Sequence, residues 1–549
     1  MKFFVIIKYI IMTLFGFSLT LILIPILLPF ALFFGFICLI AQIVIKFKYG
    51  MQTRKARGTD VVHGKRTVHS YPIINIAIRI KGKLDRKLIC EKTLTLINDH
   101  FNTNGEKTYK RLTEIYSSAF GYNIWKPFDN FCIENHVNEV SLDEVYGTHK
   151  NTENQKEHCQ NYKTLARKET FNEEMPKCNV KWSELMKLIL DKYGMKIFDE
   201  NKPQWEILLV KDDKDSYTVL YRFHHALSDG IYLSRMFCED MIDVPYFLFA
   251  KYRPPHPAIR FLTSVWSITL LPFGLWKIVS HRDLNPLHGK RLSGKKKFFV
   301  SEKIPMETLR KIQTNSSFRV SVHSILFSCI SYTLAKHFYR RNHIIPEVTA
   351  LTPIPLQNKS HPIKMKNKFA VGAINFPVSL TMADPTNGKG TNYKWEKSAL
   401  RRLELVKKSL NEMAHDISLL PLNSLINGFC SVLPTAIAEQ LLSVRGCTLA
   451  ISHLPGAKVK SKIYDGEIMD HMFWIPDREP MGVGFSIYSY NGFLRVGLLI
   501  DSALIKSDQD GFFMLESFKS EISNLLSETQ EDAKKKDDEK IAEMLQAVP

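Results

Sequence analysis

Long apolar blocks and shorter alternating blocks divide the chain into a membrane segment and a folded body. Residues 9–45 carry no charged side chain, and Pro25 and Pro29 interrupt the middle of this run. The run is longer than one membrane span of ~20 residues and longer than the apolar core of a signal peptide, and no small-residue cleavage site follows it. We therefore expect a retained membrane segment over residues 1–50. It is either one long kinked helix or, as fits the length better, a hairpin of two short helices.

The charges on either side of this run favour the hairpin. Lys2 and Lys8 precede it, and Lys46 and Lys48 follow it. Basic flanks prefer the cytosol, so a hairpin would place both ends on that side. One span with the amino terminus in the lumen stays open as an alternative, because the downstream flank is the more basic. Residues 51–67 are then expected to form a basic linker.

Two α/β blocks follow, at residues 68–257 and 299–527. The first predicts strands at 73–80 and 217–223, helices at 85–98 and from 231 onward, and a polar loop at 148–169. The second predicts helices at 320–340 and 400–413 and strands at 347–353 and 369–378. Its clearest local signal is Asn491-Gly492 between two β-rich runs, because a type I′ hairpin turn requires such a pair. The charged tail, 528–549, is expected to be frayed or disordered.

The connection between the blocks, residues 258–298, is apolar and then basic. Residues 261–276 carry no charge but are short for a span, so a membrane-interface segment and a buried helix are about equally expected. A basic cluster follows: Lys290, Arg291, Lys295, Lys296 and Lys297. This cluster is expected either to contact anionic head groups or substrate phosphates, or to be a solvated loop.

Composition narrows the partners. The 549 residues are 45% hydrophobic, enough for more than one packed core, and the formal net charge is +19. Such a positive charge implies anionic partners. No nucleic-acid-binding motif is evident, so lipid surfaces and phosphorylated substrates are favoured over nucleic acid. The nine cysteines show no CxxC or zinc-type spacing and are expected to be reduced thiols in a cytosol-facing protein.

The strongest candidate for chemistry is HHALSDG, which begins at His224 and ends at Gly230. It lies between the strand at 217–223 and a helix that has Ser228 or Asp229 available as N-cap. Successive strand side chains point to opposite faces, so one histidine packs and the other is free to accept a proton at neutral pH. Asp229 is placed to orient a ring or hold the loop, and Gly230 permits a close approach or an unusual backbone conformation. Two structural histidines beside an ordinary turn are the plainer alternative.

HHxxxDG is the signature of the coenzyme-A-dependent acyltransferases, and the chain resembles the wax ester synthase/diacylglycerol acyltransferase family within that superfamily. The resemblance covers roughly residues 68–525. It rests on these further segments: KPQWEILLV at 202–210, WKPFDNFCIENHV at 125–137, SHLPGA at 452–457, SYNG at 489–492, and Asp501. The turn geometry of Asn491-Gly492 favours a structural role for SYNG.

The resemblance implies an α/β fold of two chloramphenicol-acetyltransferase-like halves, each a mixed sheet with helices. It implies that His225 takes the proton of an alcohol as the oxygen attacks an acyl-CoA thioester, while His224 and Asp229 hold the loop and orient the base. Gly230, Asn367, Pro455 and Gly456 are expected to support the motif. The substrates implied are acyl-CoA and a lipid alcohol, which is a fatty alcohol or diacylglycerol. No cofactor or metal is expected.

Two positions depart from the family pattern. His453 replaces an asparagine in the Ser-Asn-x-Pro-Gly segment, and His323-Ser324 stand where Asn-Asp is common. Three rival functions stay open: an acyltransferase with another acceptor, an inactive membrane-bound lipid-binding protein, and a metal site on His225 and Asp229. The last needs a further ligand, and no spaced set in the sequence supplies one. The membrane is expected to be the endoplasmic reticulum or a lipid droplet, with the catalytic halves facing the cytosol.

Overall fold

The computed structural model describes most of the chain and both predicted halves. The described residues are 2–56, 58–64, 66–147, 181–247, 282–355, 364–378, 380–383, 391–394, 398–414, 428–441, 446–476 and 478–546, with seven single residues between 256 and 272. The predicted loop at 148–169 and most of the uncharged run at 261–276 lie outside them.

The sheet of the N-terminal half has β7 near its centre. β7 (Ser216–His224) is buried along its whole length, and it pairs antiparallel with β2 and with β6. The order in the sheet is β15-β16-β2-β7-β6-β5. The remaining strands are β2 (Ile73–Lys81), β5 (Val137–Val140), β6 (Trp205–Asp213), β15 (Lys462–Ile463) and β16 (Gly466–Trp474). The helices of this half are α3 (Arg86–Asp99), α4 (Leu142–Gly147), α6 (Trp182–Tyr193) and α7 (Gly230–Arg235).

The C-terminal half is built around a second mixed sheet. Its order is β11-β10-β14-β17-β18-β8, and β9 also pairs with β18. The strands are β8 (Lys296–Val300), β9 (Ile304–Pro305), β10 (Glu347–Pro355), β11 (Phe369–Pro377), β14 (Leu449–Pro455), β17 (Val483–Tyr490) and β18 (Phe493–Asp501). The helices are α10 (Met306–Asn315), α11 (Val322–Tyr339), α12 (Ala399–Ala414) and α16 (Asp508–Gln546). Asn491 and Gly492 have φ of 47° and 78°, so the predicted hairpin turn is confirmed.

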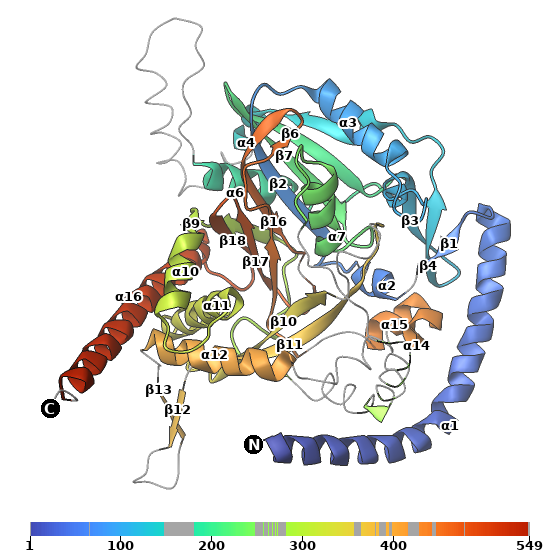
Figure 1. Ribbon diagram of the computed structural model, residues 1–549. Helices are drawn as coiled ribbons and strands as arrows, with labels where there is room; N and C mark the ends of the chain where they lie inside the picture. The colour runs from blue at the N-terminus through green and yellow to red at the C-terminus, as the bar shows by residue number, and fades with distance from the viewer. Residues whose placement is uncertain are drawn as a thin grey trace, which may run out of the picture.

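β16 ties the halves together. It follows β14 in the chain but leaves the C-terminal sheet and pairs antiparallel with β2, so that Trp474 lies opposite Asn75. The Trp474 indole still donates to the carbonyl of Phe299 in β8, at 3.0 Å. The two sheets therefore stand side by side, as Figure 1 shows, and β16 of the N-terminal sheet contacts β17 and β18 of the C-terminal sheet. The α/β fold predicted for two halves, each a mixed sheet with helices, is confirmed.

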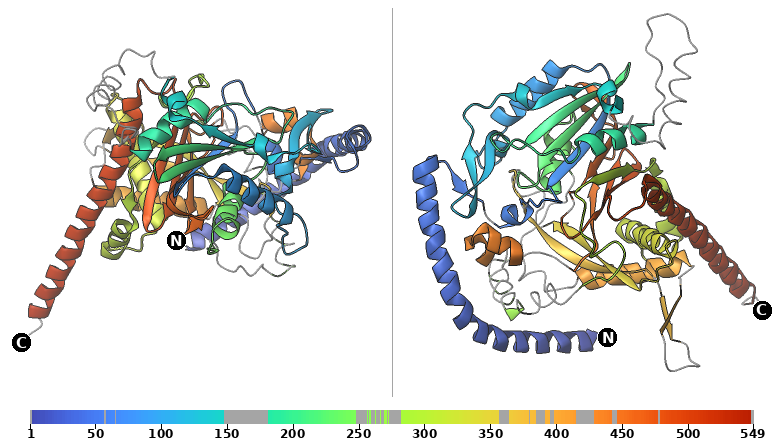
Figure 2. Two further views of the ribbon diagram at one scale, coloured as in Figure 1. Left: turned by 90° about the horizontal axis from the view of Figure 1, so that it is seen from above. Right: turned by 180° about the vertical axis from the view of Figure 1, so that it is seen from behind.

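The predicted hairpin in the membrane segment is wrong. Residues 2–49 form one continuous helix, α1 (Lys2–Tyr49), with Pro25 and Pro29 inside it. Figures 1 and 2 show it as a single bent helix along the outside of the body. The sequence between the prolines, ILL, offers no Gly, Asn or Asp for a turn, and an open turn would leave backbone groups unpaired in lipid. A proline without turn residues bends a helix without ending it.

α1 has two different surroundings. Its C-terminal part packs through Cys38, Ala41 and Ile45 onto Tyr122 and Ile124. Those two residues lie in a small sheet of β1 (Arg54–Lys55), β4 (Tyr122–Pro127) and β3 (Glu114–Ala119). The segment from Thr13 to Tyr49 is long and apolar enough to cross a membrane, with a mean hydropathy of 2.7 in its best window. Only 6% of that window is buried.

Two further expectations need correction. Lys296 of the predicted basic cluster does not face lipid or solvent, because its ammonium group lies 2.7 Å from Asp501 and both side chains are fully buried. The charged tail is not frayed over residues 528–546, because these residues continue α16, which projects from the body in Figure 2. Short blocks of acidic and basic residues in EDAKKKDDEK, at 531–540, place opposite charges three and four positions apart, a spacing that supports a helix.

The remaining elements are short. They are α2 (Thr59–His63), η1 (Lys110–Thr113), η2 (Ile133–Asn135), η4 (Met236–Asp240), β12 (Leu380–Ala383), β13 (Thr391–Lys394), α14 (Phe429–Val432) and α15 (Thr435–Leu441). α2 lies inside the predicted basic linker and bears directly on the site.

Candidate active site

The two adjacent histidines lie where β7 ends. The backbone N–H of His224 donates to Gln204 at 3.0 Å, and that of His225 donates to Pro72 at 2.7 Å. The chain then turns, with the N–H of Leu227 bonded to the carbonyl of His224 at 2.9 Å, and enters α7. The sheet therefore fixes the backbone of both histidines before either side chain makes a contact.

His224 is a packing residue. Its side chain is buried between the rings of Tyr71 and Tyr116, with centroids 5.8 and 5.5 Å away. Its Nδ1 accepts the N–H of Ala226 at 3.2 Å, so this nitrogen carries no proton and the ring closes the turn. Burial lowers the pKa of His224 to about 3, which keeps the ring neutral.

His225 is held by an amide whose direction is fixed. The Nδ2 of Asn367, just before β11, lies near three acceptors: the carbonyl of His225 at 2.9 Å, the carbonyl of Ala226 at 3.2 Å and Asp60 Oδ1 at 3.0 Å. Because all three can only accept, the NH₂ group must face them, and Asn367 Oδ1 must face His225 Nδ1, 3.1 Å away. His225 Nδ1 therefore carries the proton, and Nε2 keeps its lone pair.

Burial lowers the pKa of His225 to about 4, and the hydrogen bond from Nδ1 opposes that shift. The ring is half-buried and lies 6.1 Å from Phe369. At neutral pH this histidine is an uncharged imidazole with a defined tautomer. That is the form in which a histidine accepts a proton.

A buried ion pair supports the amide, and sequence reasoning missed both of its members. Asp60 of α2 accepts from Asn367, and Arg111 of η1 donates to both Asp60 oxygens. Arg111 also donates to the carbonyls of Ala226 and Leu227, at 2.9 and 3.0 Å. One signal was available, since Asp60 is the only acidic residue of the basic linker at 51–67.

Asp229 fixes the other end of the motif, and it is the N-cap of α7. Its Oδ1 accepts the N–H groups of Ile231 and Tyr232 at 3.0 and 2.9 Å, and its Oδ2 accepts that of Lys368 at 2.7 Å. The carboxylate thus clamps the start of α7 to the segment that carries Asn367. Burial raises the pKa of Asp229 to about 6, against the effect of these three amide donors.

The glycines of the two motifs sit at close approaches. A Cβ at Gly230 would lie 3.0 Å from the Leu454 side chain in β14. A Cβ at Gly456 would lie 2.4 Å from the carbonyl oxygen of Ser489, which accepts the N–H of Gly456 at 2.8 Å. Pro455 ends β14 beside β17. Gly230, Pro455 and Gly456 therefore lie where the halves meet, and Gly230 is explained by close approach.

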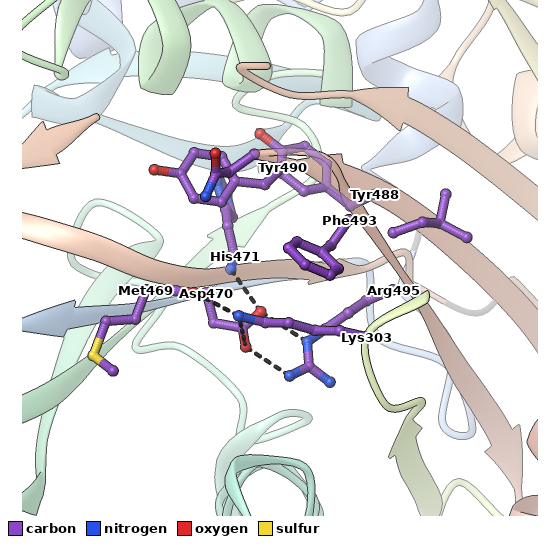
Figure 3. A pocket seen from close by; sticks show the side chains of 10 residues that line it. Lys303, Met469, Asp470, His471, Tyr488, Tyr490, Phe493 and Arg495 are labelled. Carbon is purple, nitrogen blue, oxygen red and sulfur yellow. Dashed lines mark hydrogen bonds and ion pairs between the residues drawn. The ribbon is translucent and has the colours of Figure 1, made fainter. Parts of the chain in front are cut away.

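Small cavities run along the seam between the halves. One of about 10 Å³ is lined by Gly230, Leu454, His471 and Tyr488, and a second of about 10 Å³ shares the last two residues. A third, of about 50 Å³, lies beyond them at Tyr490 and Phe493. Figure 3 shows this third cavity, in which Asp470 bonds to Lys303 and Arg495 and the tyrosine rings lie above His471. The seam near the motif is therefore mainly apolar and aromatic.

The two positions that depart from the family pattern are in contact. His323 at the start of α11 and His453 of β14 approach with their Nδ1 atoms 3.1 Å apart. Burial lowers the pKa of both rings, to about 3 for His453. Within the described part of the chain, no group of three His, Cys, Asp or Glu residues is placed to hold a metal ion.

Comparisons with known proteins agree with this architecture. The family model "WS/DGAT C-terminal domain" matches residues 367–525. A comparison with curated proteins finds no match. Among solved structures, the chain is similar to a wax ester synthase/diacylglycerol acyltransferase from Marinobacter aquaeolei VT8, with 13% identity and a TM-score of 0.54. That likeness covers 87% of this chain and 100% of that one.

Two other structures share the fold. Trichothecene 15-O-acetyltransferase from Fusarium sporotrichioides has 10% identity and a TM-score of 0.52, over 86% of this chain and 95% of that one. The EpoB NRPS cyclization-docking bidomain from Sorangium cellulosum has 10% identity and a TM-score of 0.50, over 86% and 85%. The matched domain begins at Asn367, the residue that holds His225. Residues 367–525 therefore match the C-terminal domain of the wax ester synthase/diacylglycerol acyltransferase family, and the chain as a whole shares the fold of a solved member of that family.

Proposed function

We propose that the protein is an acyl-CoA-dependent O-acyltransferase that esterifies a lipid alcohol, with His225 as general base. The observation that carries this proposal is the fixed tautomer of His225, because an Nδ1–H bonded to Asn367 leaves Nε2 able to accept a proton. Within the family, the same constellation is expected to serve an alcohol acceptor and a thioester donor.

The reaction balances without a further co-reactant. Nε2 of His225 removes the hydroxyl proton as the alcohol oxygen attacks the thioester carbonyl. The C–S bond then breaks, the ester is released, and the coenzyme A sulfur takes the proton from the imidazolium. General-base help of this kind contributes ~10²–10⁴-fold, and positioning of the two substrates supplies much of the rest.

Two surfaces favour a lipid acceptor. α1 presents many exposed apolar side chains, among them Leu21, Ile22 and Phe33, and the seam beside Gly230 is mainly apolar. An enzyme held at a bilayer meets fatty alcohol or diacylglycerol where these lipids dissolve. The product is a wax ester with the first acceptor and triacylglycerol with the second, and both belong to the proposal.

The proposed location is the endoplasmic reticulum or a lipid droplet, with both catalytic halves in the cytosol. Because α1 is one helix, a full span would put the amino terminus on the far side, opposite the more basic flank at Lys46 and Lys48. Protease digestion of sealed microsomes that carry tags at both termini checks this arrangement. Loss of the amino-terminal tag, or protection of the catalytic halves, would contradict it.

The activity test uses purified full-length protein in neutral nanodiscs with labelled acyl-CoA. The acceptors are a long-chain alcohol, diacylglycerol and a water-soluble alcohol. Transfer to a lipid acceptor that disappears in His225→Ala is the expected result. Transfer only to the soluble alcohol would contradict the lipid acceptor, and lipid binding without any transfer would favour the inactive lipid-binding protein.

A further inference from the structure

A large cavity lies between the end of α1 and the N-terminal half. Its volume is about 970 Å³, which is at the upper end of the range for small-molecule sites. The walls come from the end of α1, from the segment that contains β1, from residues around η1, and from residues 125–129 and 364–366. Most of these segments are distant in sequence, so the cavity forms only in the complete fold.

The walls of this cavity are strongly cationic. Eight Lys and Arg side chains line it, against four carboxylates. Three of the carboxylates are already in ion pairs with lining residues: Asp60 with Arg111, Glu106 with Lys364, and Glu114 with Arg54. The cavity therefore keeps an excess of positive charge, which favours an anionic ligand.

Two polar groups in the walls are left without the usual partner. Lys366 is half-buried and lies 5.7 Å from the Tyr232 ring, and no carboxylate among the described residues is within 4.0 Å of its ammonium group. Burial and the nearby cations Lys368, Lys364 and Arg111 lower the pKa of Lys366. The Trp125 side chain is 1% exposed, and among the described residues its indole N–H has no acceptor. Each of these groups is suited to an acceptor oxygen.

The cavity shares two wall residues with the support of the proposed base. Asp60 and Arg111 line it, and the same two residues hold Asn367, which bonds to His225 Nδ1. Lys366 directly precedes Asn367 in the chain, so the cavity wall is continuous with the amide that holds the proposed base. A phosphorylated molecule with a reactive arm fits that arrangement.

We propose that this cavity binds phosphate groups, and that they are those of the coenzyme A part of the acyl donor. This inference rests on the proposed function, since that function requires such a donor. Gln42, Ile45 and Lys46 of α1 form part of the wall, so the membrane helix completes the donor site. Anionic lipid head groups also carry phosphate groups, and the experiment distinguishes coenzyme A from lipid as the source of the phosphate.

The experiment compares three substitutions in the full-length protein in neutral nanodiscs. Lys366→Ala removes the half-buried cation, and Trp125→Phe removes the N–H but keeps the ring. Lys311→Ala is the control, because it removes one exposed lysine of α10, outside the cavity walls. Direct titration with coenzyme A measures affinity without turnover. Steady-state kinetics then compare long-chain acyl-CoA with the same acyl group on pantetheine, which lacks the nucleotide phosphates.

We expect Lys366→Ala to raise the Kd for coenzyme A about tenfold and Trp125→Phe to raise it about threefold, with no change in Lys311→Ala. The KM for acyl-CoA should rise with the Kd, while kcat and the kinetics with acyl-pantetheine stay the same. Unchanged coenzyme A affinity in both cavity variants would overturn the inference, and so would equal losses with both donors.

Binding to vesicles with and without anionic lipid distinguishes the other source of phosphate. If Lys366→Ala weakens binding to anionic vesicles but not to coenzyme A, the assignment to coenzyme A is overturned. The binding measurements are independent of turnover. If coenzyme A binds in a Lys366-dependent way but no acyl transfer occurs, the proposed function is contradicted and the cavity assignment is kept. If acyl transfer occurs but the affinity for coenzyme A does not depend on Lys366, the cavity assignment is overturned and the proposed function is kept.

Discussion

Two pairs of histidines in this protein look alike and are held differently. His224 and His225 lie at the end of β7, and His323 and His453 meet between α11 and β14. Burial lowers the pKa of all four rings. The two pairs differ in the hydrogen bond that orients each ring. His225 is bonded to the Asn367 amide, which the Asp60–Arg111 ion pair holds, whereas His323 and His453 are bonded to each other.

The two pairs differ in whether the tautomer is defined, and this difference supports the proposal that His225 is a base. In the His323–His453 pair, one Nδ1 must donate and the other accept, and either assignment satisfies the contact. In the motif, Asp60 and two carbonyls fix the direction of Asn367, which fixes the proton on His225 Nδ1. A low pKa is common to both pairs, but a defined tautomer distinguishes the motif.

Removing one ring from each pair is the most direct test of this difference. His225→Ala should lower kcat about 10³-fold while the protein still folds and binds membranes, because the proposed base is lost. His453→Asn should keep activity within about threefold. Labelled-ester formation measures both, and thermal melting serves as the folding control. Comparable losses in the two variants would remove the distinction.

Removing the amide should have the next largest effect. Asn367→Ala leaves His225 Nδ1 without its fixed acceptor, and kcat should fall about 10²-fold with little change in KM. Asn367→Gln is the matched control that keeps an amide but moves it. A positioning role predicts partial recovery or a shifted pH profile in that variant, whereas a loss of melting temperature in step with activity would indicate a purely structural role.

The pH profile tests the neutral state of His225. Its pKa of about 4 lies below the ordinary 6.5, so the neutral ring persists in mildly acidic solution. The fall in kcat/KM that protonation of His225 causes should therefore be centred near pH 4. Asp229 has a raised pKa of about 6, and its protonation weakens its hydrogen bond with the Lys368 backbone N–H. We therefore expect a second, separate fall in kcat/KM near pH 6. Comparing kcat/KM of wild type and Asp229→Asn separates the two. A fall in kcat/KM centred at pH 6.5 in both proteins would contradict a lowered pKa for His225.

The smallest expected effect concerns acid stability at the second pair. His453 titrates at about 3 in the folded chain and near 6.5 when unfolded, so the folded state resists protonation. The stability that depends on its neutral form is complete above about pH 6.5 and is lost as the pH falls toward 3. His323→Asn/His453→Asn should therefore lose about 2 kcal/mol less than wild type between pH 7 and pH 5. Melting curves at both pH values measure the difference.

Local patterns in the sequence predicted local structure well. The buried run before His224 is β7, Asp229 is one of the two residues predicted as the α7 N-cap, and Asn491-Gly492 makes the predicted turn. The motif and its flanking segments indicated the family. These features depend on residues within a few positions of one another, where periodicity and turn chemistry apply.

Contacts between distant segments were not predictable in the same way. Asp60 and Asn367 are separated by 307 positions, and their meeting depends on how both halves fold. Lys296 belonged to a basic run, yet its partner Asp501 lies on a neighbouring strand and makes it a core residue. The hairpin prediction for α1 was wrong because the length of an apolar run does not by itself make a turn, and no turn residue lies between Pro25 and Pro29.

The pairing of β16 with β2 has a consequence for how the chain folds during synthesis. β2 is made early, but its partner at residues 466–474 leaves the ribosome only after most of the C-terminal half has been made. Contacts of such long sequence separation slow folding, and the open strand edge is exposed to aggregation in the meantime. We therefore expect a nascent chain that ends before residue 466 to depend on chaperones, even though α1 is already complete.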